Sequence, residues 1–239
     1  MRKITINLAA VAAFCIVVAS PALVSSSCAT PKTEQEDTTI IREDSGITAL
    51  KYSSPEVPAS IEFCGKTIDL SRFDRHERMD RELLAFTYMH STSLQMLKKA
   101  NRYFPIVEPI LKENGIPDDF KYLMVIESNM NPTARSSAGA AGLWQFMQGT
   151  GRDYGLEVNN NVDERYHIEK ATRAACRYLK DAYAKYKDWV AVAASYNAGQ
   201  ARIASQLAKQ DVDDSLDLQL VEETARYVYR ILAAKQLFS

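Results

Sequence analysis

The chain has 239 residues, of which 46% are hydrophobic and 25% are charged. This composition is typical of a globular protein with one sizeable core and a small appendage, and it does not favour two large domains. The net charge is -1 and the pI is about 6.3, whereas binding to a phosphate backbone demands a basic surface, so no nucleic-acid partner is expected. His76, His90 and His167 lack the spacing of metal ligands, and we expect no metal site and no cofactor.

The N-terminus has the pattern of a secretory signal. Arg2 and Lys3 precede an apolar stretch, residues 8–19, that is shorter than a membrane-spanning helix needs. We therefore predict a signal over residues 1–28 and an exported protein of the periplasm or cell envelope. The small residues before Cys28 are typical of a lipoprotein processing site, although Ser25 stands where Leu is usual. Lipidation of Cys28, with anchoring to the outer membrane, and cleavage by an ordinary signal peptidase both remain open.

The next segment changes character twice. Residues 29–60 are rich in Thr, Ser, Pro, Glu and Asp without periodicity, so they bury too little apolar surface to offset chain entropy and are predicted to form a flexible tether. IEFCGKTIDL (residues 61–70) has β-forming residues around Gly65 and predicts a short hairpin. Residues 61–110 are otherwise expected to form a helical extension that precedes a catalytic domain at 111–239.

Apolar residues at helical spacing predict a mainly α fold for most of the chain. Residues 74–104 fit one long helix or two shorter ones, and Pro105 and Pro109 are expected to flank a further turn or two. In ENGIP (residues 113–117), Gly suits the end of a helix and Pro the start of the next. Further helices are predicted to end near Asn129, to cover residues 171–186 and 189–199, and to begin near Val221.

An acidic residue interrupts an apolar helix face. The stripe through Leu123 and Met124 reaches Glu127 at its next position. A carboxylate there loses hydration and lies at the negative end of the helix dipole, so two effects raise its pKa toward the value that a general acid needs. The alternative is a structural role, in which Glu127 turns outward or pairs with Arg135.

Two cysteines follow the predicted signal and the Cys28 site. Cys64 and Cys176 could form a disulfide in an oxidising compartment. Cys176 lies on the apolar face of a predicted helix, so two separate buried thiols are an equal alternative.

Three motifs occur in order along the second half of the chain, and the first of them contains Glu127. They are IESNMNPTARSSAGAAGLWQFM (126–147), SYNAG (195–199) and ETARYV (223–228). Together they resemble the signature of the lytic murein transglycosylases, which cleave peptidoglycan glycan strands on a lysozyme-like fold related to goose-type lysozyme. The sequence departs from the family pattern at Ser195, where Ala is usual, and at Tyr229, where Pro is common.

The resemblance implies a role for particular residues. Glu127 would be the catalytic acid, Ser136 would bond Glu127 or the substrate acetamido group, and Gln145 would bond a sugar. Trp144 is expected in the core, Tyr196 is expected to face the acid, and Glu223 is expected to position substrate or structure rather than act as a nucleophile. The full set of expected substrate-binding residues is Ser136, Gln145, Met147, Tyr196, Asn197, Glu223 and Tyr227.

The resemblance also implies a mechanism with one carboxylate. Glu127 would protonate the MurNAc-GlcNAc β-1,4 bond of a glycan strand, and the substrate's own acetamido and C6 hydroxyl groups would supply the nucleophiles, which yields a 1,6-anhydroMurNAc end. Most glycosidases instead use two carboxylates. The alternatives are a goose-type muramidase that uses water and a peptidoglycan-binding protein without turnover.

Overall fold

The structure, a computed structural model, describes residues 55–239. The predicted signal, Cys28 and most of the predicted tether lie outside the described residues. All described residues belong to one compact unit. Within it, no helix is long and apolar enough to cross a membrane.

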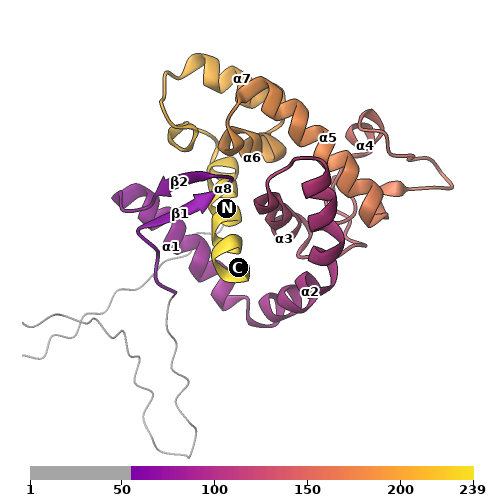
Figure 1. The fold of residues 1–239 in the computed structure, drawn as a ribbon, viewed down its shortest axis with the longest axis horizontal. Helices are drawn as coiled ribbons and strands as arrows, with labels where there is room; N and C mark the ends of the chain where they lie inside the picture. The colour runs from indigo at the N-terminus through magenta and orange to yellow at the C-terminus, as the bar shows by residue number, and fades with distance from the viewer. Residues whose placement is uncertain (1–54) are drawn as a thin grey trace, which may run out of the picture. The chain divides into compact units, whose positions relative to one another are not determined.

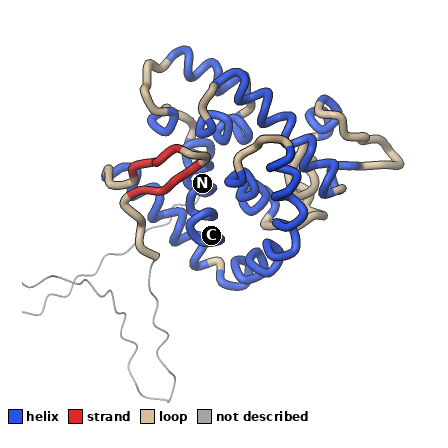
Figure 2. Tube along the Cα trace, in the orientation of Figure 1, coloured by secondary structure: helices blue, strands red, loops and turns tan. Residues whose placement is uncertain are grey.

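A two-stranded hairpin opens the described chain, as predicted (Figure 2). Strands β1 (Ser60–Phe63) and β2 (Lys66–Asp69) pair antiparallel. The turn residues Cys64 and Gly65 both have positive φ, 53° and 81°, which is the backbone of the tight turns that match strand twist. The hairpin is therefore built on a turn that Gly65 makes easy and Cys64 tolerates.

The region after the hairpin forms two helices, α1 (Phe73–Tyr88) and α2 (His90–Glu113), rather than one. Pro105 and Pro109 flank a helical turn, as expected, but this turn is continuous with α2, because both prolines lie inside that helix. The helix continues because Val107 and Leu111 extend its buried face past the prolines. It ends as ENGIP predicted, with Gly115 at φ 66°.

The rest of the chain is helical and connected by loops. Helices α5, α6 and α8 match the predicted segments, and α6 stops before Gly199 as expected, while α4 and α7 were not predicted. The elements are η1 (Asp118–Lys121), α3 (Tyr122–Ser128), α4 (Gln148–Asp153), η2 (Glu164–Tyr166), α5 (Ile168–Tyr186), α6 (Trp189–Ala198), α7 (Gln200–Lys209), η3 (Ser215–Asp217) and α8 (Glu222–Phe238).

Helix α8 is the element around which the described chain is arranged. It packs against α1, α3 and α6, and Figure 1 shows it between α1 and α3. One continuous hydrophobic core runs from Ile61 in the hairpin to Ala234 in α8. The predicted boundary between residues 110 and 111 falls within α2, so the predicted extension is part of the same packed unit rather than a separate body.

The two cysteines within the described residues are unpaired. Cys64 is half-buried in the hairpin turn and Cys176 is buried on α5. Of the two alternatives left open by the sequence, the structure shows two separate thiols.

A buried ion pair ties α1 to the start of α8. The Glu82 side chain is 2% exposed. Arg226 donates to it with Nε at 2.7 Å from Oε1 and Nη2 at 3.2 Å from Oε2. The exposed side of the pair is completed by Arg81, which also bonds Glu222. Removing Arg226 would leave a buried carboxylate with weaker compensation.

We expect Arg226→Ala to lower the free energy of unfolding by about 2 to 3 kcal/mol, because it uncovers the buried charge of Glu82. The control is Glu222→Gln, which removes an exposed partner of Arg81 and should cost less than about 1 kcal/mol. Urea unfolding measures both variants. Equal, small effects would show that water compensates Glu82.

Candidate active site

Glu127 is the second-to-last residue of α3, and its side chain reaches a residue of α8. Leu123 and Met124 on the same helix are fully buried, and Glu127 is half-buried. The Tyr227 hydroxyl of α8 donates to Glu127 Oε1 at 2.5 Å. The acid therefore neither turns outward nor pairs with Arg135, which is exposed.

Burial is the largest effect on the charge of Glu127. It raises the pKa of Glu127 above its ordinary value, while the hydrogen bond from Tyr227 and the positive charge of Arg230 lower it and the negative charge of Glu223 raises it. The net direction is upward, toward the protonated form. Burial and the charge of Glu127 raise the pKa of Tyr227 well above its usual value, so Tyr227 remains a neutral donor.

The end of α3 is unusual in its backbone. Asn129 and Met130 follow the helix with φ values of 50° and 56°, a left-handed pair that caps α3 and turns the chain away. The Asn129 amide donates to Val125 O at 3.1 Å. This turn leads directly into the loop of residues 131–147, which holds the predicted residues Ser136, Gln145 and Met147.

One buried arginine holds this loop in place. Arg165 donates through Nη1 to Gly139 O at 2.8 Å and to Phe146 O at 3.0 Å. Its other nitrogens bond Asp163, with Nη2 at 2.7 Å from Oδ2. Gly142 also lies against the Arg165 backbone, where an added Cβ would come within 1.9 Å of the carbonyl oxygen. Sequence reasoning missed Arg165, because no motif links it to carbonyl groups that lie 26 and 19 residues earlier in the chain.

The resemblance implied two possible partners for Ser136, Glu127 or the substrate acetamido group, and the structure shows no bond to Glu127. Ser136 Oγ accepts instead from the Ala140 amide at 3.0 Å, which closes its own turn. Gln145 Nε2 donates to Gly142 O at 2.8 Å and Ala134 O at 3.2 Å, so its carbonyl oxygen remains for a ligand. Met147 is 46% exposed.

The aromatic residues of the motifs divide between core and site. Trp144 is fully buried, as predicted, and donates to Thr172 Oγ1 at 2.9 Å. Tyr196 donates to Trp144 O at 2.8 Å. Burial, followed by the negative charge of Glu127, raises the pKa of Tyr196 well above its usual value.

The third motif links α6 and α8. Thr224 Oγ1 donates to Asn197 Oδ1 at 2.8 Å, so Asn197 fixes α6 to the first turn of α8. Glu223 is exposed and makes no side-chain hydrogen bond or ion pair with other residues of the 55–239 range. The structure thus joins Glu127 to Tyr227 at the α3–α8 contact and Asn197 to Thr224 at the α6–α8 contact, and Glu223 lies exposed in the first turn of α8.

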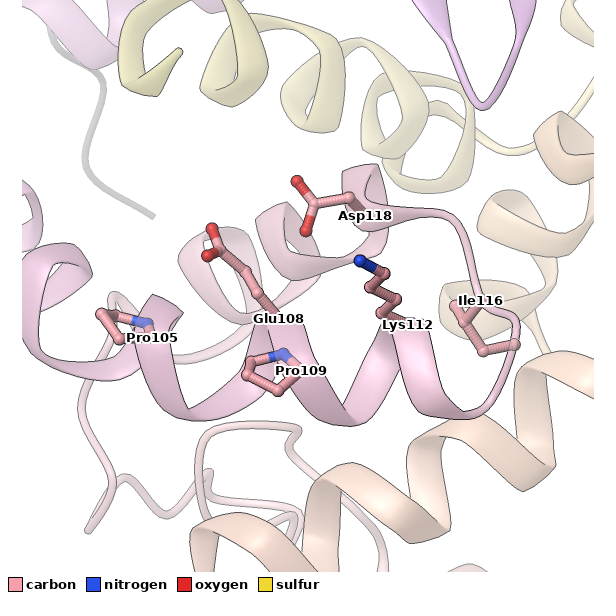
Figure 3. Close-up of a pocket in the computed structure, with 6 residues that line it drawn as sticks. All are labelled: Pro105, Glu108, Pro109, Lys112, Ile116 and Asp118. Carbon is pink, nitrogen blue, oxygen red and sulfur yellow. The ribbon is translucent and has the colours of Figure 1, made fainter.

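A surface pocket of about 520 Å³ lies elsewhere, along α2 and η1 (Figure 3). Two of its lining residues, Glu108 and Asp118, form ion pairs with Lys121, whose Nζ lies 2.8 Å from Glu108 Oε1 and 2.5 Å from Asp118 Oδ2. The pocket contains none of the predicted site residues and is lined by Pro105, Glu108, Pro109, Lys112, Ile116 and Asp118. Within residues 55–239, no group of three acidic, His or Cys side chains could hold a metal ion.

We expect Gly142→Ala to be much more damaging than Gly139→Ala. Both glycines have positive φ, which costs any L-residue about 1 to 2 kcal/mol, but a Cβ at Gly139 meets open space. The clash with Arg165 should raise the cost of Gly142→Ala above about 3 kcal/mol. Thermal unfolding of the two variants checks this, and equal losses would mean that the loop can move away from Arg165.

Comparison with known proteins agrees with the motifs. The family described as transglycosylase SLT domain matches residues 105–217. Membrane-bound lytic murein transglycosylase D of Escherichia coli (strain K12) is 30% identical over 166 residues, which are 67% of this chain and 36% of that protein. Peptidoglycan transglycosylase gp16 of Escherichia phage T7 is 31% identical over 123 residues, 50% of this chain and 9% of its own.

A solved structure of an inactive mutant of lytic transglycosylase Slt from Pseudomonas aeruginosa has a TM-score of 0.49 and 22% identity, and the match covers 70% of this chain and 31% of that one. The chain spans only about a third of the length of the transglycosylase D relative. The family match confirms the predicted mainly α, lysozyme-like fold class. Its last matched residue precedes α8. Residues 105–217, which contain the first two of the three motifs, therefore match the transglycosylase SLT domain family, in agreement with the predicted resemblance.

Proposed function

We propose that the protein is a peptidoglycan lytic transglycosylase that cleaves the MurNAc-GlcNAc β-1,4 bond with Glu127 as its general acid and base. One observation carries this proposal. Glu127, which lies within the matched SLT segment, accepts a hydrogen bond from the neutral hydroxyl of Tyr227. Burial raises the pKa of Glu127 toward the protonated form. Relatives of this chain bear the name lytic murein transglycosylase.

The proposed reaction balances without water. Protonated Glu127 gives its proton to the glycosidic oxygen, which leaves as the C4 hydroxyl of GlcNAc while the C1–O bond breaks. The acetamido oxygen of MurNAc stabilises the positive charge at C1. The C6 hydroxyl then forms a bond to C1 and returns its proton to the Glu127 carboxylate, which leaves a 1,6-anhydro ring and regenerates the acid.

The surrounding groups support glycan binding in this proposal. The Gln145 carbonyl oxygen can accept from a sugar hydroxyl or amide, and the exposed Met147 side chain offers an apolar surface to a sugar ring. The hydroxyl of Ser136 accepts one bond from Ala140 and still has a proton to donate to an acetamido oxygen. Tyr196 and Glu223 lie within electrostatic reach of the acid.

The cell envelope is the proposed location, because its substrate is there and relatives are named membrane-bound lytic murein transglycosylases. The predicted signal over residues 1–28 supports export. Attachment to the outer membrane through a lipidated Cys28 is part of the proposal, and mass spectrometry of the mature N-terminus tests it.

We expect the protein to release fragments from purified murein sacculi, and Glu127→Gln to reduce that release at least about 100-fold, the usual scale for a general acid. Mass spectrometry decides the reaction, since the 1,6-anhydro product lacks the water that hydrolysis adds. Hydrated products would indicate a muramidase. Binding to sacculi without release by the parent would indicate a wall-binding protein, and equal release by both proteins would remove Glu127 from catalysis.

The same variant should be at least as stable as the parent at neutral pH. The pKa of Glu127 is raised in the folded state, so the folded protein binds the proton more tightly than the unfolded chain does. The parent therefore loses stability as the pH rises from the unfolded pKa through the folded pKa of Glu127. Gln does not titrate, and Tyr227 can still donate to its carbonyl oxygen. The advantage of Glu127→Gln should therefore vanish in acid. Urea unfolding across pH measures it, and lower stability of the variant at pH 7 would mean that the carboxylate is structural.

A further inference from the structure

We propose that Arg230 is a positioning residue for the acid, which holds the C-terminal end of α3 and places a positive charge beside Glu127. This inference rests on the proposed function. Neither the three motifs nor the matched SLT segment contains Arg230.

Helical spacing places Arg230 on the same face of α8 as Tyr227. Glu223, Tyr227 and Arg230 are separated by four and three residues, so they follow one another along one face of the helix. Tyr227 reaches the Glu127 carboxylate at 2.5 Å. One turn further on, Arg230 Nη2 lies 3.4 Å from the carbonyl oxygen of Ile126, the residue before Glu127. Adjacent turns of α8 therefore hold the side chain of the acid and the backbone that carries it.

The bond to a carbonyl, rather than to the carboxylate, is the informative feature. A direct ion pair between Arg230 and Glu127 would hold the acid ionised and prevent it from donating a proton. By bonding Ile126 O, the guanidinium stays close to the acid without closing it off. It also gives the last turn of α3 a cation, which suits the negative end of the helix dipole.

Two charges of opposite sign on α8 act on Glu127. The positive charge of Arg230 lowers the pKa of Glu127, and the negative charge of Glu223 raises it. The other titratable groups that face the acid, Tyr227 and Tyr196, are neutral donors.

The charged residues of the neighbouring η1 are paired elsewhere. Asp118 binds Lys121, and Asp119 binds Lys235 at 2.7 Å. The balance between Arg230 and Glu223 is thus set along a single helix.

This balance matters because one carboxyl group must act twice. With burial alone, Glu127 would hold its proton too tightly to release it to a leaving group and would return too slowly to the ionised form. The positive charge of Arg230 opposes the effect of burial and makes the ionised form of Glu127 more accessible. Glu223 prevents the opposite fault, an acid that is ionised before the substrate binds.

The test measures the titration of Glu127 directly, independently of turnover. The full chain is labelled with ¹³C at glutamate carboxyl groups, and the Glu127 resonance is assigned by its loss in Glu127→Gln. We expect Arg230→Gln to move the titration of Glu127 to higher pH, Glu223→Gln to move it to lower pH, and Arg230→Lys, which keeps the charge, to stay close to the parent. The alkaline limb of fragment release from sacculi should move in the same directions.

The outcomes separate the two proposals. An unchanged Glu127 titration in Arg230→Gln, or an equal shift in Arg230→Lys, would overturn the role of the Arg230 charge whatever the products are. The expected shifts together with products that contain added water would leave this inference standing and overturn the transglycosylase reaction. If Arg230→Gln does not fold, Arg230→Met, which keeps the aliphatic stem, takes its place with the same expected direction.

Discussion

The site depends on one hydrogen bond, which joins Glu127 of α3 to Tyr227 of α8 across a buried helix contact. An acid in this position loses hydration, so its partner must satisfy the carboxylate without fixing its charge. A neutral hydroxyl does this, because it donates to a carboxylate and also tolerates a carboxylic acid. Everything that sets the position of α8 therefore sets the chemistry available to Glu127.

Parts of the chain outside the matched SLT segment set the position of α8. The acid lies inside residues 105–217, but Tyr227 follows that segment and α1 precedes it. The Glu82–Arg226 pair holds α1 against the turn of α8 that contains Tyr227. Helix α1, predicted as part of an extension, thus supports the position of α8, and α1 and the hairpin share one hydrophobic core with the rest of the described chain.

Sequence patterns predicted what depends on periodicity and motif order, including the buried helix α6, the hairpin turn and the acid on an apolar stripe. The sequence patterns failed where several local contributions to the folding free energy compete. A proline inside a helix costs about 3 kcal/mol or more, which favours a break at Pro105, yet each buried Val or Leu beyond it gains about 1.5 to 3 kcal/mol. The continued apolar face of α2 offsets the prolines. Likewise, spacing alone could not show that Ser136 would bond its own turn, since a short hydroxyl has many partners nearby.

Arg165 and Arg230 show why the remaining features could not be read from sequence. Both donate to backbone carbonyl groups, Arg165 to the loop of residues 131–147 and Arg230 to the end of α3. A carbonyl acceptor has no side-chain signature, so neither contact leaves a pattern of paired residue types. Cations that bind carbonyl groups can fix the backbone of a site while leaving its carboxylate unpaired. A site that depends on one acid needs this arrangement, because a cation placed on the acid itself would hold it ionised and remove the proton it must give.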